Sequence, residues 1–568
     1  LPTRSVHGLP IIEHAEFGRN VPDEAMPDED KMNLGKIYHM GKEEAAGLLL
    51  NRQAMASHTF ITGSTGTGKS NAVYHLLDEI TKNGQTTFLV VEPAKGEYKN
   101  VFGNCTDVQV FGTNPRETPL LRMNPFAFPE NIHILEHIDR LVEIFNACWP
   151  MYAAMPAVLK DAIERSYQKV GWDLRNSESE KGVFPTFFDL LDILPGVIEE
   201  SHYSKDTQSD YVGALCTRVK SLTNGIYGSV LCAEDALTDE ALFDRNVIVD
   251  LSRVGSMETK SLLMGILVMK LQEYRMCSSG MNSRLRHVTV LEEAHNLLRK
   301  TSAEQSQEGA NLQGKSVEML ANAIAEMRTY GEGFIIADQA PGLLDMSVIR
   351  NTNTKIILRL PDEEDRKLVG KSAALKEAQI DELSKLPLGV AAVYQNEWPE
   401  AVLCKIEAYP MPENAVYHKP SKMPHEINAE FVFGQLAVGK ELKPLSSSEM
   451  EQLKLWLKRH ETVLKPEDSR YLERVFAGGE LDVAKTRKAV FDFFGGISTV
   501  VDYCAAAEKS LTPRKEFLEQ LQGQYGLKAA AADWVLNSVI SMGMSLNPDA
   551  KAVDNLRTNF ERQGGRVL

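Results

Sequence analysis

The sequence predicts an α/β protein with a mostly parallel central sheet, a helical insertion and a helical C-terminal region. From residue 58 onwards, short apolar runs rich in Val, Ile and Phe alternate with helical stretches, which is typical of buried parallel strands and their crossover helices. One of these runs leads through a glycine-rich loop directly into an amphipathic stretch. The 568 residues are 43% hydrophobic and 25% charged, a globular composition that excludes a collagen-like or wholly disordered chain.

Seven short runs are the predicted strands of this sheet. Strands that alternate with helices favour right-handed crossovers in an α/β core. Between Glu92 and Arg245 we find no clear strand signal, and residues 131–230 instead show helical periodicity. The seven predicted strands are Thr59–Thr62, Thr86–Val91, Asn246–Leu251, Val288–Leu291, Phe334–Ala337, Lys355–Leu360 and Val390–Tyr394.

The order of these patterns predicts four regions. Residues 1–57 contain four prolines and an acidic run, so we expect a partly extended entry segment there rather than a packed unit. The core is expected over 58–130 and 231–420, with the helical insertion at 131–230 between its two parts. Residues 421–568 are expected to form a helical C-terminal region.

Charge and cysteine content limit the classes of function. Asp and Glu outnumber Lys and Arg by 78 to 62, and the net charge of −16 excludes a generally basic nucleic-acid coat. The seven cysteines are scattered without a C-x-x-C pair, which favours a reducing compartment. The longest apolar run, Leu262–Met269, is far shorter than the about 20 residues of a membrane-spanning helix. We therefore expect a cytoplasmic protein without a membrane segment.

The strongest motif is G-S-T-G-T-G-K-S, which fits the phosphate-binding pattern G-x-x-x-x-G-K-[ST] between a strand and a helix. Its glycines let the backbone N–H groups surround phosphates, and the following helix adds the positive end of its dipole. Lys69 would reach the β- and γ-phosphates of ATP, and the Ser70 hydroxyl would ligate Mg²⁺. The predicted nucleotide-binding residues are Gly63, Ser64, Thr65, Gly66, Thr67, Gly68, Lys69, Ser70 and Asn71.

Two acidic residues follow the strand Val288–Leu291, as in a Walker B motif. By position, Glu292 would face Mg²⁺ through water, and Glu293 would activate the attacking water as a general base. An acid pair at a strand end also occurs for purely structural reasons. The histidines show no metal-ligand grouping, so Mg²⁺ is the only metal that we expect.

Further polar residues close the neighbouring strands. Gln339 follows the strand Phe334–Ala337 and could orient water at the γ-phosphate, or simply bond to a loop. Glu92 closes the second strand, where it could face the nucleotide or cap the following turn.

An arginine finger is a further requirement of many such sites. Arg328, just upstream of the strand Phe334–Ala337, is the candidate, and Arg350 and Arg359 are less favoured. The alternative for any single arginine is a surface salt bridge.

Together these motifs resemble the HerA branch of the HerA–FtsK ATPases. The resemblance rests on H-T-F-I-T-G-S-T-G-T-G-K-S-N, V-V-E-P-A-K-G-E-Y, V-L-E-E-A-H, M-R-T-Y-G-E-G-F-I-I-A-D-Q-A-P and V-I-R-N-T-N-T-K-I-I-L-R-L, and covers residues 1–420 in outline. The entry segment resembles the stretch that leads from the family's N-terminal barrel into its motor domain. The family usually has Asp within an aspartate–proline–histidine box where this chain has Glu92.

The resemblance implies a RecA-like P-loop NTPase core in a homo-hexameric ring that pumps double-stranded DNA. ATP would lie between subunits, with Arg328 as the finger supplied in trans. It also implies an effector partner, such as a nuclease or a sirtuin-like NAD-consuming enzyme, in DNA end processing or phage defence.

A DNA contact is expected close to the Walker B box. Arg299-Lys300 and Lys315 flank the polar stretch Thr301–Gly314, which is predicted to be a loop facing the channel. The alternative is a loop that only meets solvent. Because no aromatic residues interleave with the basic ones, duplex contact is favoured over binding to single strands.

Three alternatives to a DNA translocase remain at this point. The chain could be a secretion or conjugation ATPase, or an ATP-loaded ring that serves as a scaffold for an effector enzyme. A small-molecule kinase fits less well, because the chain shows no Arg-rich lid.

Overall fold

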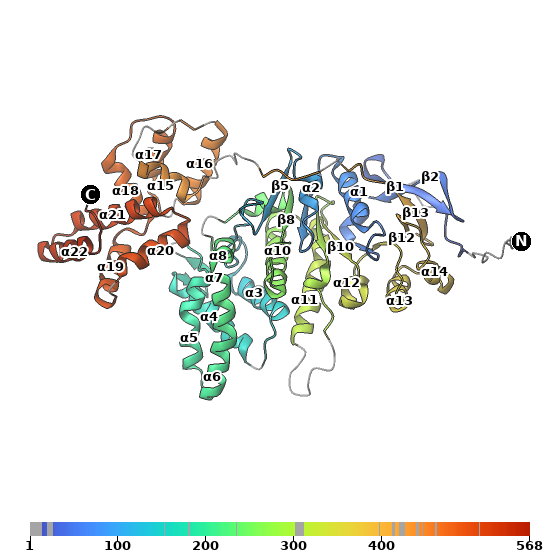
Figure 1. Ribbon diagram of the computed structural model, residues 1–568, viewed down its shortest axis with the longest axis horizontal. Coiled ribbons are helices and arrows are strands. Elements are labelled where there is room, and N and C mark those ends of the chain that lie inside the picture. The colour runs from blue at the N-terminus through green and yellow to red at the C-terminus, as the bar shows by residue number, and fades with distance from the viewer. Residues whose placement is uncertain are drawn as a thin grey trace, which may run out of the picture.

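The computed structural model describes the chain except for residues 1–13, 20–25, 153, 180–181, 234–235, 302–311, 397, 412–414, 420–426, 439–441, 443, 446, 461–462, 511 and 568. The molecule is elongated (Figure 1). The sheet and its covering helices lie at the N-terminal end, and the C-terminal helices lie at the other end. The helices of the insertion lie between them.

One 11-stranded sheet organises the core, in the order β2-β1-β13-β12-β11-β3-β10-β9-β4-β8-β5. The strands from β11 to β5 in this order are mutually parallel. The other four pairs, β11 with β12, β12 with β13, β13 with β1 and β1 with β2, are antiparallel. The strands are β1 (Lys31–His39), β2 (Lys42–Asn51), β3 (Thr59–Thr62), β4 (Thr87–Glu92), β5 (Val108–Gly112), β8 (Asn246–Asp250), β9 (His287–Glu292), β10 (Glu332–Asp338), β11 (Thr354–Ile357), β12 (Val390–Gln395) and β13 (Val402–Ile406).

Every strand predicted from the sequence is present, Thr59–Thr62 with the predicted bounds and the others with bounds shifted by at most three residues. The expectation of an extended entry segment was wrong for residues 31–51, which form β1 and β2 and continue the sheet beyond β13. The stretch between Glu92 and Arg245, where the sequence shows no clear strand signal, contains β5 at the edge of the sheet and two strands of two residues each within the insertion. An edge strand has only one neighbour, and the alternation of Val108, Gln109 and Val110 gives a weaker signal than a continuous apolar run.

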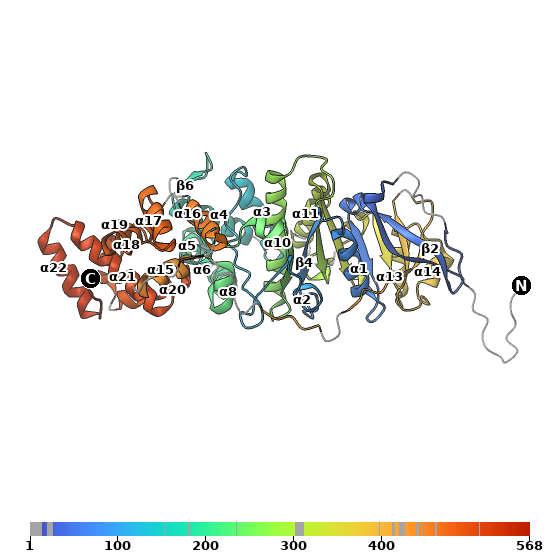
Figure 2. The ribbon, with the colours of Figure 1, turned by 90° about the horizontal axis from the view of Figure 1, so that it is seen from above.

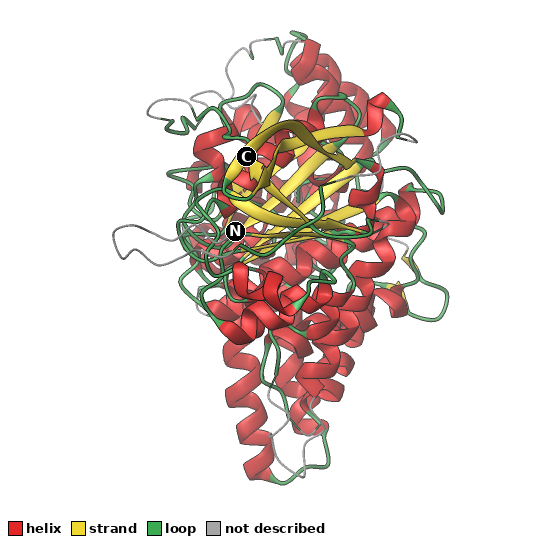
Figure 3. Ribbon diagram, turned by 90° about the vertical axis from the view of Figure 1, so that its right-hand side faces the viewer, coloured by secondary structure: helices red, strands yellow, loops and turns green. Residues whose placement is uncertain are grey.

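Helices cover both faces of the sheet (Figure 3). One face packs against α1 (Lys69–Thr81) and α2 (Tyr98–Phe102) in one buried cluster. The other face packs against α3 (Ile134–Cys148), α10 (Met257–Ser278), α11 (Leu312–Glu326) and α12 (Met346–Arg350) in a second cluster. Alternate residues of a strand enter the two clusters, as Phe60 and Ile61 of β3 show.

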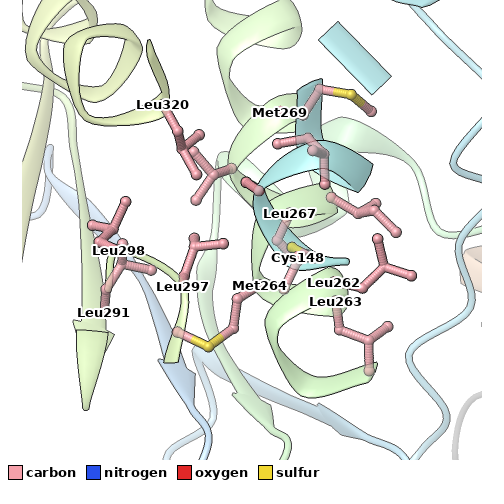
Figure 4. Packing of buried hydrophobic residues seen from close by; sticks show 14 of the residues in the cluster. Cys148, Leu262, Leu263, Met264, Leu267, Met269, Leu291, Leu297, Leu298 and Leu320 are labelled. Atoms are coloured by element: carbon pink, nitrogen blue, oxygen red, sulfur yellow. The ribbon is translucent and has the colours of Figure 1, made fainter. Parts of the chain in front are cut away.

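The helix α10 contains the longest apolar run of the sequence and is buried on nearly every side. Its residues Leu263, Met264 and Leu267 belong to the same buried cluster as Cys148 of α3 and Leu320 of α11 (Figure 4). A helix that is apolar all round requires such a position within a core. The run that the sequence offers as its longest hydrophobic segment is therefore a core helix.

The insertion is helical, as predicted, and shares its core with the sheet. Its further elements are α4 (Met155–Lys169), β6 (Trp172–Asp173), β7 (Glu178–Ser179), α5 (Phe187–Glu200), α6 (Lys205–Tyr211), a π-helix (Val212–Cys216), α7 (Thr217–Thr223), α8 (Gly225–Leu231) and α9 (Asp239–Phe243). Two short helices, α13 (Glu363–Ser372) and α14 (Glu377–Glu382), lie between β11 and β12.

The C-terminal region has a hydrophobic cluster of its own, formed by residues between 427 and 560. Figure 2 shows these helices at the end of the molecule opposite to β2. They are α15 (Ala429–Val438), α16 (Ser447–Arg459), α17 (Pro466–Phe476), α18 (Val483–Phe493), α19 (Gly496–Lys509), α20 (Pro513–Tyr525), α21 (Ala529–Leu546) and α22 (Ala550–Arg562). No single helix of the described residues is long and apolar enough to cross a membrane, and only the bent pair Val483–Phe493 with Gly496–Ala507 passes the same test of length and composition.

Candidate nucleotide site

The glycine-rich loop joins the end of β3 to the start of α1, at the edge of the sheet where the parallel strands end. Gly66 and Gly68 have φ values of +76° and +105°, which other residues rarely adopt. A Cβ at Gly66 would meet nothing within 4 Å, so this part of the loop faces open space. Gly68 is the N-cap of α1, so the helix N-terminus points toward the same space.

The loop is held in place by backbone groups from neighbouring segments. Both the N–H and the hydroxyl of Ser64 donate to the carbonyl oxygen of Arg359, at 3.0 and 3.1 Å. The Gly389 N–H donates to the carbonyl oxygen of Thr67 at 3.0 Å, and the Thr67 hydroxyl donates to that of Ser64 at 2.7 Å. The loop is therefore shaped before any phosphate arrives, and its remaining N–H groups are left for a ligand.

A cavity of about 300 Å³ lies over this loop. Eight of the predicted site residues line it, together with Lys95 and Leu388, which the sequence analysis did not assign. The predicted residues that line the cavity are Ser64, Thr65, Gly66, Gly68, Lys69, Ser70, Asn71 and Gln339. Gly63, Thr67, Glu92, Glu292, Glu293 and Arg328 do not line it.

Lys69 connects the loop to the acidic end of β9. Its Nζ lies 3.2 Å from Glu292 Oε2 and 3.1 Å from Glu293 Oε1, and its side chain is only 7% exposed. Burial by itself would lower the pKa of Lys69, but the two carboxylates outweigh it and raise the pKa. The ammonium group of Lys69 is thus kept charged beside the cavity. A triphosphate bound in the loop can replace the two carboxylates as its partner.

Glu293 belongs to a chain of hydrogen bonds that crosses the site. Gln339 Nε2 donates to Glu293 Oε1 at 2.8 Å, and the Thr65 hydroxyl donates to Gln339 Oε1 at 2.8 Å. The backbone of Glu293 is left-handed, with φ 45° and ψ 52°, a conformation that costs a non-glycine residue about 1–3 kcal/mol. The fold therefore holds this carboxylate in one orientation and links it to the loop through the predicted sensor.

Asp338 supports the same turn from the end of β10. Its carboxylate is fully buried and accepts hydrogen bonds from the N–H of His295, the ring of His295 and the N–H of Ala340, each at 2.9 Å. The hydrogen bond to Asp338 raises the pKa of His295, although partial burial opposes it. The bonds tie the turn after Glu293 to the turn that carries Gln339.

These residues correct the expectation that no histidine joins a metal-ligand grouping. Glu293, His295 and Asp338 each place one ligand atom within 4.8 Å of the others, a spacing that could hold a metal ion. Both oxygens of Asp338 already accept hydrogen bonds, so we assign the group a positioning role. The sequence does not indicate this group, because 43 residues separate His295 from Asp338.

Glu92 has the second of its two expected roles. It accepts hydrogen bonds from the N–H of Glu97 at 2.7 Å and of Tyr98 at 3.1 Å, and so caps the start of α2. Burial raises its pKa to about 8, against the effect of these two bonds. Glu92 therefore holds the turn between β4 and α2 and does not line the cavity, contrary to the expectation that it binds the nucleotide.

Two other predicted residues are engaged by the protein itself. Asn71 donates to the carbonyl oxygen of Glu407 at 3.0 Å and accepts from the N–H of Tyr409 at 2.9 Å, so its amide fixes the chain after β13. Glu292 accepts a hydrogen bond of 2.5 Å from the hydroxyl of Tyr98 in addition to its contact with Lys69. Tyr98 was missed because only the fold brings the start of α2 to the end of β9.

Arg328 lies far from this cavity in its own chain. It is exposed on the short helix Met327–Tyr330, which leads into the start of β10, whereas the cavity lies beyond the end of β10. Arg350 and Arg359 are also exposed and do not line the cavity. The predicted channel loop falls mostly on residues 302–311, outside the described residues, and Leu312–Gly314 are already part of α11.

The comparisons with known proteins agree with this geometry. The family model for the central domain of helicase HerA matches residues 32–270. A probable helicase of Methanocaldococcus jannaschii is 23% identical over 436 residues, which cover 70% of this chain and 76% of that protein. The DNA double-strand break repair helicase HerA of Sulfolobus acidocaldarius is 25% identical over 393 residues, 66% of this chain and 69% of that protein.

Among solved structures, VirB4 of Thermoanaerobacter pseudethanolicus superposes with a TM-score of 0.51 at 18% identity. The superposition covers 68% of this chain and 98% of that one. At this identity the likeness supports the α/β RecA-like fold and nothing finer.

Proposed function

We propose that this chain, a HerA-like ATPase of the HerA–FtsK superfamily, uses ATP hydrolysis to move along double-stranded DNA as a homo-hexameric ring. The observation that carries the proposal is the set of contacts joining Lys69, Glu293, Gln339 and Thr65 beside the phosphate-binding loop. The set combines a phosphate-binding cation, a general base and a sensor at one edge of the sheet. These are the groups that hydrolysis of a nucleoside triphosphate requires.

The residues present fit ATP with Mg²⁺. Open space over Gly66 and the N-terminus of α1 suit the phosphates, and the hydroxyl of Ser70 with the carboxylate of Glu292 would hold Mg²⁺, the latter through water. Magnesium, when bound, neutralises charge on the β- and γ-phosphates.

Hydrolysis then follows from the contacts of Lys69 and Glu293. A triphosphate in the loop draws the Lys69 ammonium from the two carboxylates, which leaves Glu293 free to accept a proton. Water attacks the γ-phosphorus, its proton passes to Glu293, and the bond to the β-phosphate oxygen breaks to release ADP and phosphate. Gln339, bonded to both Glu293 and Thr65, reports whether the γ-phosphate is present.

A ring is proposed because the finger and the cavity lie at opposite edges of the same sheet. Arg328 is exposed and cannot reach the cavity of its own chain from the start of β10. A neighbouring subunit that packs its Arg328 edge against the cavity would complete the site. The hexameric state is part of this proposal.

Double-stranded DNA is the proposed substrate along which the ring moves, although the chain has a net charge of −16 and DNA is also negatively charged. Arg299, Lys300 and Lys315 are exposed and flank residues 302–311. In a ring, these cations would contact phosphates of a duplex in the channel without base recognition. The C-terminal helices, which have a core of their own, are the proposed platform for an effector such as a nuclease or a sirtuin-like NAD-consuming enzyme.

The direct test measures ATP hydrolysis by the purified chain with and without linear duplex DNA, together with the particle size in negative-stain images. We expect hydrolysis that duplex DNA stimulates, six-fold rings, and no hydrolysis by Lys69→Ala. Hydrolysis that DNA leaves unchanged would contradict the translocase and favour a scaffold role in phage defence or DNA end processing.

Glu293→Gln separates a scaffold from a translocase, whereas stimulation by linear duplex DNA separates a secretion-type ATPase from a DNA translocase. If an effector remains active with Glu293→Gln but not with Lys69→Ala, then ATP binding rather than hydrolysis is what the effector requires. A translocase needs both residues.

A further inference from the structure

We propose that Lys95 is a second phosphate-binding cation of this site, which contacts the γ-phosphate and makes the site prefer ATP to ADP. The inference rests on the proposed function and adds to it a residue that lies outside the P-loop and Walker B motifs. Lys95 lines the cavity together with Thr65, Gly66 and Gln339. Of these, Thr65 and Gln339 belong to the hydrogen-bonded chain that ends at the general base.

The backbone at Lys95 is strained in a way that presents the side chain. Lys95 has φ 65°, and Gly96 follows with φ 69°, so two consecutive residues are left-handed. Lysine gains nothing from this conformation, and strained residues of this kind concentrate at functional sites. Such strain persists only where the surrounding structure fixes the segment.

The turn that carries Lys95 is fixed on both sides. Before Lys95, Glu92 accepts the N–H groups of Glu97 and Tyr98. After it, Lys99 Nζ forms an ion pair of 2.6 Å with Asp250, a carboxylate that is only 2% exposed.

Gly96 and Tyr98 fix the same turn against the ends of β8 and β9. A Cβ on Gly96 would come within 3.4 Å of the Asp250 carboxylate, so a larger residue would push the turn away from β8. The hydroxyl of Tyr98 donates to Glu292, so the turn is joined to the predicted metal ligand. The residues on either side of Lys95 thus contact other parts of the protein, and Lys95 is the residue of this turn that lines the cavity.

The charge of Lys95 is largely uncompensated. Among the residues that the structure describes, its nearest ionic partner is Glu97, at 3.9 Å, and the two side chains are 48% and 49% exposed. Such exposed pairs contribute about 0–1 kcal/mol and are easily exchanged for another anion. Lys69 differs, because two carboxylates within 3.2 Å already hold it. A γ-phosphate entering the cavity therefore meets one engaged cation and one available cation.

The position along the nucleotide follows from the other lining residues. Ser70, whose hydroxyl would ligate Mg²⁺ between the β- and γ-phosphates, lines the cavity at the start of α1. The turn that carries Lys95 follows β4, which pairs with β9 as far as Val91 and Leu291, so it lies beside the end of β9 that carries the acids. Since ADP lacks the γ-phosphate, Lys95 would contribute to binding ATP and little to binding ADP.

The experiment compares the affinities of Lys95→Ala, Lys95→Arg and the unchanged chain for Mg²⁺ with ADP and with the non-hydrolysable analogue AMP-PNP. We expect Lys95→Ala to weaken AMP-PNP binding about tenfold or more, as for loss of a charge-assisted hydrogen bond, and to change ADP binding less than twofold. Lys95→Arg, which keeps the charge, should recover most of the loss. Lys551→Ala, an exposed lysine of α22, is the matched control and should change neither.

Each outcome decides the proposal. Equal weakening of both nucleotides, or of neither, overturns the role of Lys95, and so does a Lys95→Arg variant as weak as Lys95→Ala. Failure of the unchanged chain to bind AMP-PNP overturns the proposed function itself, which is a separate result. Because Lys95 is half exposed, its replacement should leave the unfolding temperature unchanged, and this check excludes misfolding as the cause.

Discussion

Replacement of Asp338 by Asn tests whether the turn after Glu293 sets the rate of hydrolysis. Asp338 accepts three N–H bonds of 2.9 Å with no exposure to solvent. An amide of the same shape has one oxygen, so in either orientation its NH₂ group faces an N–H donor. An unsatisfied buried donor costs about 1–3 kcal/mol.

Part of that free energy will be relieved by movement of the turn, and Glu293 moves with it. A displacement of about 1 Å in a catalytic group lowers the rate by up to about a hundredfold. We therefore expect kcat for ATP to fall between about tenfold and a hundredfold, with AMP-PNP affinity changed less than threefold, because Asp338 does not line the cavity.

The assay is steady-state hydrolysis, with nucleotide affinity and unfolding temperature measured in parallel. The control is Asp345→Asn, since Asp345 also accepts a backbone N–H at 2.9 Å but is only half-buried, as the N-cap of α12. Asn is as good a cap as Asp, so this variant should keep full activity. A kcat for Asp338→Asn within twofold of the unchanged chain would refute the role given to the turn.

The remaining predictions concern hydrolysis, the ring and pH. Glu293→Gln should abolish turnover while AMP-PNP still binds, whereas Lys69→Ala should lose binding; residual turnover above about one per cent in Glu293→Gln would point to another base. Arg328→Ala should be inactive alone but recover partial activity when mixed with Glu293→Gln, because each supplies what the other lacks; no recovery in mixed rings would count against a finger in trans. Since the pKa of Glu92 is raised to about 8, the folded state binds its proton more tightly than the unfolded state, and stability should fall as pH rises from about 4.5 to 8, by up to about 1.4 kcal/mol per pH unit. Unfolding titrations of Glu92→Gln should show a flatter slope over this range, and equal slopes would contradict the assignment.

The sequence predicted the parts of the site that are contiguous in the chain. The loop from Gly63 to Ser70 could be found because strand, loop and helix follow one another in a fixed order, and the acids Glu292 and Glu293 because they close an apolar strand. Gln339 could be placed at the same edge because parallel strands end together. The central strands were equally visible, since burial on both faces demands continuous apolar runs.

Residues that reach the site from other segments could not be predicted in this way. A left-handed backbone directs Lys95 to the cavity. The neighbouring residues in the sequence do not predict that conformation. Tyr98 is 194 residues from its partner Glu292 in the sequence, and His295 is 43 residues from Asp338. The strands β1 and β2 were missed because much of β2 is exposed to solvent. Its charged side chains are typical of a linker as well as of an exposed strand.

The strand β10 explains why one chain by itself should be a poor catalyst. Its seven residues span about 23 Å, with Arg328 before its first residue and Gln339 after its last. Both ends are pinned by buried ionic contacts, Glu332 to Arg275 at 2.9 Å and Asp338 to His295 at 2.9 Å, so the strand cannot bend to bring them together. In the proposed ring, the proposed sensor Gln339 and the proposed finger Arg328 would therefore flank the same rigid strand, and a change at one would be transmitted to the other without any rearrangement of the sheet.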